Sequence, residues 1–87
     1  MQLRGSELDL FLESLPTVDK VGVKEFLSKE FEINCRSGVV RLKPVRVFTS
    51  FVHGRGGVYV IWGIFICPDG KIVKKALGKY IEKLKKD

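Results

Sequence analysis

The chain has 87 residues, enough for one domain and near the lower limit for a fold held by a hydrophobic core alone. Hydrophobic residues make up 45% of it and charged residues 30%, a composition that excludes a disordered chain. The net charge of +6 is uneven, because residues 1–33 carry four basic and seven acidic side chains and residues 34–87 carry twelve and three. Such asymmetry indicates a polyanionic partner for the basic part, with a merely solvated basic surface as the alternative.

The first residues of the chain indicate its cellular location, and its cysteines bear on whether it holds a metal. Met1 to Gly5 is followed by a polar stretch instead of the apolar core of a signal peptide, so we expect a cytoplasmic protein. Cys35 and Cys67 are interpreted as two buried thiols, or as a disulfide if the source is a hyperthermophile. With His53 they still fall short of the four ligands of a structural zinc site, so we predict neither a metal nor a cofactor. Asparagine and glutamine occur once each, a depletion that favours a thermophilic source.

Two helices are predicted first. Ser6 is placed to cap a helix that Pro16 ends, with an apolar stripe at helical spacing formed by Leu8, Phe11, Leu12 and Leu15. Asp19 is placed to cap a second helix whose apolar face extends to Phe31. The outer faces of both helices are acidic or mixed, which disfavours a helix-turn-helix that reads DNA. We therefore expect both to cover a sheet.

A central strand is predicted over Val58–Cys67, ten residues without a charge. Pro68, Asp69 and Gly70 then form a turn, and Lys71–Lys75 pairs back as a third strand. Before it, a strand interrupted at Pro44 runs from Val39 to Phe51, with basic side chains typical of a sheet edge at Arg41, Lys43 and Arg46.

A helix from about Ala76 or Lys79 to Lys86 completes the prediction. The fold class is therefore α+β, with two N-terminal helices, a three-stranded antiparallel meander and a C-terminal helix, in a single domain over residues 1–87. Lys74, Lys75 and Ala76 would lead into the last helix, and this order of elements resembles double-stranded-RNA-binding domains. In that family lysines at this helix start meet phosphates, but its Gly-Pro-x-His loop is missing here and the preceding helix is acidic.

No residue pattern supports catalysis. His53 could act as a general base, but the basic part of the chain offers almost no carboxylate to orient it, so no catalytic residue is predicted. The loop Gly54–Gly57 either exposes backbone N–H groups and Arg55 to phosphate or only reverses the chain. Tyr59, Trp62 and Phe65 are assigned to the core in preference to base stacking, since Trp62 and Phe65 point to opposite faces.

The sequence therefore predicts a small basic nucleic-acid-binding protein without catalytic activity, which contacts the phosphates of DNA or RNA with little base specificity. The alternative is a protein-interaction module or homodimer that uses an apolar sheet face, and no membrane partner is expected. The predicted nucleic-acid-binding residues are Arg41, Lys43, Arg46, Arg55, Lys71, Lys74, Lys75, Lys79 and Lys83.

Overall fold

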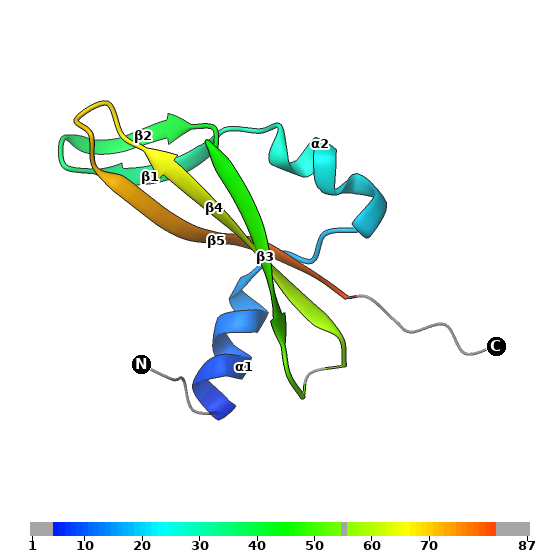
Figure 1. The fold of residues 1–87 in the computed structure, drawn as a ribbon. Coiled ribbons are helices and arrows are strands. Elements are labelled where there is room, and N and C mark those ends of the chain that lie inside the picture. The colour runs from blue at the N-terminus through cyan, green and yellow to red at the C-terminus, as the bar shows by residue number, and fades with distance from the viewer. Residues whose placement is uncertain (1–4, 55, 82–87) are drawn as a thin grey trace.

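Five strands dominate the computed structural model, which describes residues 5–54 and 56–81 (Figure 1). The helical elements come first: α1 (Gly5–Ser14), the 3-10 turn η1 (Lys20–Gly22) and α2 (Val23–Leu27). The strands follow: β1 (Phe31–Cys35), β2 (Gly38–Leu42), β3 (Arg46–Val52), β4 (Val58–Ile66) and β5 (Ile72–Ile81). They form two antiparallel sheets, a hairpin β1-β2 and a three-stranded sheet β3-β4-β5.

The predicted fold class is wrong, because the protein is mostly β and residues 76–81 continue β5 instead of starting a helix. A β-bulge explains the error. The register of β4 and β5 shifts so that Leu77 has no partner between Ala76, opposite Trp62, and Gly78, opposite Ile61. The extra residue spaces the apolar positions of β5 as a helix would, so the sequence pattern is ambiguous. The rest of the predicted helix lies outside the described residues.

Two further elements differ from the prediction. The second helix ends at Leu27, and Phe31 begins β1, in which Ile33 and Cys35 are buried and Glu32 is exposed. The strand expected over residues 39–51 is two strands in different sheets, because the chain leaves the hairpin after Leu42. The similarity to double-stranded-RNA-binding domains fails with the helix, since residues 74–76 lie within β5.

The central strand and its turn are as predicted. β4 spans Val58–Ile66 between β3 and β5, and the amide of Gly70 donates to the carbonyl of Cys67 at 2.9 Å to close the next turn. The loop before β4 contains three glycines with positive φ, which side chains disfavour: Gly54, Gly56 and Gly57. Asp19 caps η1 through its Oδ1, which accepts from the amide of Val21 at 3.3 Å.

Different elements pack on the two faces of the three-stranded sheet. On the inner face the hairpin β1-β2 and α2 enclose a core around Phe65, Ile33, Leu77 and the two cysteines. On the opposite, outer face α1 packs through Leu12 and Leu15 onto Val58 and Val60. Figure 1 shows the hairpin beside the upper half of the three-stranded sheet and α1 beside its lower half. The chain passes between the two faces around the edge of β5, where Gly78 is buried and an added Cβ would lie 3.1 Å from the Pro16 carbonyl oxygen.

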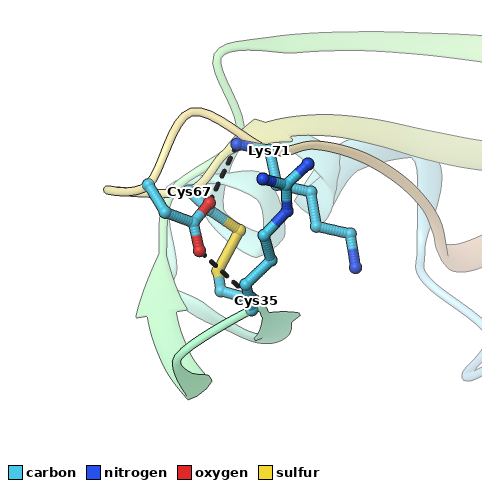
Figure 2. The surroundings of a disulfide bond; sticks show 5 residues. Cys35, Cys67 and Lys71 are labelled. Carbon is cyan, nitrogen blue, oxygen red and sulfur yellow. Dashed lines mark hydrogen bonds between the residues drawn. A yellow bond between two sulfur atoms is a disulfide. The ribbon is translucent and has the colours of Figure 1, made fainter.

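A disulfide joins the end of the hairpin β1-β2 to the end of β4. Cys35 and Cys67 are 32 residues apart in sequence and have an S–S distance of 2.03 Å (Figure 2). Beside it, the Asp69 carboxylate accepts from the amides of Arg36 at 3.0 Å and Lys71 at 2.9 Å. Of the two interpretations of the cysteines, the structure therefore shows the disulfide. It fixes the hairpin to the three-stranded sheet at the turn after β4.

Candidate nucleic-acid interface

The outer face of the three-stranded sheet is only partly covered by α1. Because side chains alternate along a strand, the register places every second residue of β3 and β4 on this face, and the same holds for β5 on either side of its bulge. α1 packs over the end of the face that contains Val58 and Val60. The other end, toward the disulfide, carries the residues Arg46, Phe48, Trp62, Ile64, Ile66, Ile72 and Lys74, which we call the open patch.

Two cations flank the middle of the open patch. Arg46 on β3 and Lys74 on β5 both pair with Ile64 on β4, so they lie in one row across the sheet. Neighbouring strands are about 4.8 Å apart, which puts the two backbones about 10 Å from each other. Both residues are exposed, and no carboxylate of the described residues forms an ion pair with either of them. Both charges are therefore available to an anionic ligand.

Trp62 organises the aromatic part of the patch. Lys74 places its Nζ 5.1 Å from the centroid of the Trp62 ring, a cation–π contact. Phe48 stacks on the same indole with centroids 6.3 Å apart, and Phe11 of α1 stacks on it at 6.0 Å. The indole Nε1 donates to the Ser50 hydroxyl at 2.9 Å. These contacts hold the ring in one orientation at the border between α1 and the open patch.

Exposed apolar side chains complete the patch. Ile66 and Ile72 are directly opposite each other at the end of the β4-β5 hairpin, and 51% and 70% of their surface is accessible. Phe48 is also exposed. Apolar groups between cations suit a ligand that has charged phosphates next to less polar sugars and bases. The sequence prediction missed these three residues, since their exposure depends on where α1 ends on the sheet.

Lys75 and Lys79 of β5 lie on different faces of the sheet and have different partners. Lys75 points to the inner face, where its Nζ donates to the backbone carbonyl of Glu32 at 2.9 Å. The bulge turns Lys79 to the outer face, where its Nζ donates to the carbonyls of Leu12 and Leu15 at 2.6 and 2.5 Å. Lys79 is therefore partly buried and engaged with α1, although the sequence predicts it to be a free phosphate ligand.

The other predicted cations that the structure describes are not members of the open patch. The guanidinium of Arg41 on β2 lies 3.8 Å from the carboxylate of Glu30, just before β1, and 4.0 Å from that of Glu32 on β1, so these two acidic residues offset its charge. Lys43 follows β2 and Lys71 lies in the turn before β5, both exposed. Arg55 and Lys83 lie outside the described residues. Of the predicted residues that the structure describes, Arg46 and Lys74 are the two that lie in the open patch.

The structure places the histidine of the sequence analysis beside an aromatic ring. His53 is exposed and lies edge-on to Phe51, with ring centroids 4.9 Å apart. Within residues 5–54 and 56–81, no three histidine, cysteine or acidic side chains lie together as metal ligands would. In the same part of the chain no helix has the length and apolarity needed to cross a bilayer.

The aromatic residues are divided between the faces as the sequence predicts. Phe65 is fully buried in the inner core, whereas Trp62 is half-buried on the outer face. Tyr59 stacks on Tyr80 of the neighbouring strand, with centroids 5.1 Å apart. Trp62, assigned to the core in preference to base stacking, packs against α1 and also forms one wall of the open patch.

Comparison with known proteins identifies a relative that matches this chain over almost its whole length. The chain is 46% identical over 59 residues to the chromatin protein Cren7 of Caldivirga maquilingensis, a match that spans 68% of this chain and 93% of the relative. No protein-family model matches the chain. No solved structure matches it either. The identity over almost the whole relative shows that the chain belongs to the Cren7 family of chromatin proteins.

Proposed function

We propose that the protein binds double-stranded DNA through the open patch and has no catalytic activity. The observation that carries this proposal is the row Arg46–Ile64–Lys74, in which two exposed cations, neither in an ion pair with a described carboxylate, flank an apolar strip on one face of a sheet. Membership of a family of chromatin proteins supports DNA as the nucleic acid, since DNA is what chromatin contains. A two-stranded or three-stranded β surface is one of the shapes that dock against a duplex.

In this proposal Arg46 and Lys74 neutralise phosphates, and the arginine can contact a phosphate with two parallel N–H groups. Ile66, Ile72 and Phe48 contact sugars and base edges between them, which adds contact area without hydrogen bonds that select a base. Affinity then depends on salt, because each neutralised phosphate releases counterions. Little sequence preference is expected, which suits a protein that packages DNA.

The direct test is fluorescence anisotropy with labelled duplex DNA of two unrelated sequences, and with single-stranded DNA and duplex RNA of the same length. We expect both DNA duplexes to bind at low salt with affinities within several-fold of each other, and more tightly than either other probe. Absence of duplex binding at low salt would refute the proposal. Equal or tighter binding of duplex RNA would refute the choice of DNA.

A homodimer that buries the open patch is the second candidate, favoured by the exposure of Ile66 and Ile72. It makes the opposite prediction about salt, since an apolar interface does not weaken as salt rises. Sedimentation at several protein concentrations distinguishes the two. A monomer at concentrations well above those needed for DNA binding excludes the dimer as the role of this patch.

A further inference from the structure

α1 lies on the same face of the sheet as the open patch and continues it. Leu12 and Leu15 are buried against Val58 and Val60, and the partly buried residues around them include Phe11, Trp62 and Ala76. Phe11 stacks on the indole whose other contacts are Phe48 and Lys74 of the open patch. The covered strip and the open patch are therefore one surface, divided by the position of α1.

The charge of α1 is the same sign as that of DNA. Residues 5–14 contain three acidic side chains, Glu7, Asp9 and Glu13, and no basic one. Glu7 and Glu13 are exposed. Because α1 packs on the same face of the sheet as Lys74, its negative charge opposes the approach of DNA phosphates to that face. The position of α1 both limits the area available to DNA and opposes its approach.

The attachment of α1 uses a cation that DNA would also attract. The ammonium of Lys79 caps the end of α1 by hydrogen bonds to the carbonyls of Leu12 and Leu15. Without α1 this ammonium would be exposed on the outer face of the sheet, because Lys79 lies directly opposite Val60 on the neighbouring strand. A phosphate is a stronger partner for an ammonium than two neutral carbonyls.

The chain next to α1 is anchored independently. Thr17 forms a parallel bridge with Lys79, and the backbone bonds Val18 N to Lys79 O and Lys79 N to Pro16 O measure 2.7 and 2.9 Å. α1 can therefore leave the sheet while the following segment stays on β5. A helix of ten residues is marginal by itself in water, so α1 depends on the sheet to remain helical. A groove of about 650 Å³ runs along this junction, bounded among others by Phe11, Trp62 and Lys74.

We propose that α1 is a displaceable acidic cover, and that duplex DNA competes with it for the strip of sheet around Val58, Val60 and Lys79. The inference rests on the proposed function, because it specifies how the same face is regulated. Displacement uncovers the Trp62 ring and frees the Lys79 ammonium for phosphate. DNA can occupy the covered strip only in molecules whose α1 is displaced. The apparent affinity for DNA is then the affinity of these molecules multiplied by the fraction of the population that they represent.

Hydrogen exchange of the full chain, with and without a saturating mixed-sequence DNA duplex, tests the displacement directly. We expect the amides of α1 to lose protection when duplex is added, while those of β4 keep it or gain it. Unchanged or increased protection of α1 in the complex overturns the inference. If no duplex binds at any salt concentration, the proposed function itself fails; binding with α1 still protected refutes only the cover.

Two sets of variants test the competition by affinity. The pair Leu8→Ala and Phe11→Ala weakens docking, since both side chains pack against the sheet, whereas Leu10→Ala is a matched control on the same helix with 67% of its surface exposed. We expect the pair to bind duplex several-fold more tightly than the parent, with a log–log salt slope steeper by about one because Lys79 joins the contacts. The control should bind as the parent does.

The variant Glu7→Gln, Glu13→Gln leaves the apolar side of α1 intact and so covers the case in which the alanine pair does not fold. It should bind duplex several-fold more tightly than the parent, because the repulsion is reduced while the helix stays docked. Affinities equal to the parent in every folded variant overturn the inference.

Discussion

On the outer face of the three-stranded sheet, Lys74 of β5 holds its Nζ 5.1 Å from the centroid of the Trp62 ring on β4. The contact restrains a long side chain, so part of the entropy of ordering the lysine has been lost before any ligand arrives. It also keeps the ammonium on the same face of the sheet as Arg46. A restrained cation is better suited to binding phosphate than one that must be ordered in the complex.

Trp62 provides a signal for binding, because it is the only tryptophan of the chain. Adding duplex DNA should change its emission, since the ammonium and the stacked rings around the indole shift when phosphates bind Lys74. The midpoint of the change should move to higher DNA concentration as salt is added. Trp62→Phe should abolish the signal while anisotropy still detects binding. An emission unaffected by a bound duplex would place the contact elsewhere.

Reduction of the Cys35–Cys67 disulfide should destabilise the fold. The bridge closes a loop across 32 residues, and its loss is expected to lower the free energy of unfolding by about 3–4 kcal/mol through the entropy of the unfolded chain. Urea unfolding with and without reductant measures this difference. In the variant Cys35→Ala, Cys67→Ala the reductant should have no effect. An unchanged midpoint of the parent after verified reduction would contradict the expectation.

Asp69 should make stability depend on pH in the acid range. The hydrogen bond donated by the Lys71 amide, helped by that of the Arg36 amide, lowers the pKa of this carboxyl below its ordinary value of 3.8. A pKa depressed by folding stabilises the native state above the ordinary value, and the stabilisation is lost as pH falls through the lower, folded value. The difference in unfolding free energy between parent and Asp69→Ala should therefore be present at pH 6 and shrink below pH 3.8.

The variant Asp69→Asn checks the cause, because it keeps an acceptor oxygen but cannot ionise. Its stability should lack the part of the acid dependence that the parent owes to this carboxyl. A parent and an Asp69→Asn variant with parallel profiles between pH 6 and pH 2 would show that the carboxylate contributes nothing measurable.

Gly63 is required by packing on β4. An added Cβ would lie 2.8 Å from Leu77 Cδ1 and 2.9 Å from Phe65 Cε1, both in the inner core. Gly63→Ala should therefore cost about 1–3 kcal/mol of unfolding free energy, as overpacked cores do. Gly22→Ala is the matched control, because no atom lies within 4 Å of its added Cβ. Equal urea midpoints for the two variants would contradict this account of the core.

The parts of the fold that sequence could predict are those fixed by neighbouring residues. β4 is a continuous run of apolar and β-branched residues, and the turn after it follows from proline and glycine. β5 could not be predicted in the same way, because a bulge at Leu77 breaks the alternation that identifies a strand. The separation of β2 from β3 also depends on packing between sheets, which a local pattern does not contain.

The candidate site shows the same limit at the level of single lysines. Lys74 and Lys75 are adjacent and identical in charge, yet one lies over Trp62 and the other bonds to the carbonyl of Glu32. Lys79 bonds to α1, more than sixty residues earlier in the chain. An excess of cations predicts a polyanionic partner, but only the positions of the hairpin and α1 decide which cations remain available.

The central claim is that phosphates are bound by Arg46 and Lys74, and the salt dependence of duplex affinity tests it most directly. For the parent, the logarithm of affinity should fall linearly with the logarithm of salt concentration, and in Arg46→Ala, Lys74→Ala that slope should be shallower by about 2. The control variant Lys24→Ala removes an exposed lysine of α2, outside the open patch, and should keep the salt slope of the parent. If the double variant folds and binds with the slope and affinity of the parent, the open patch is not the DNA-binding site.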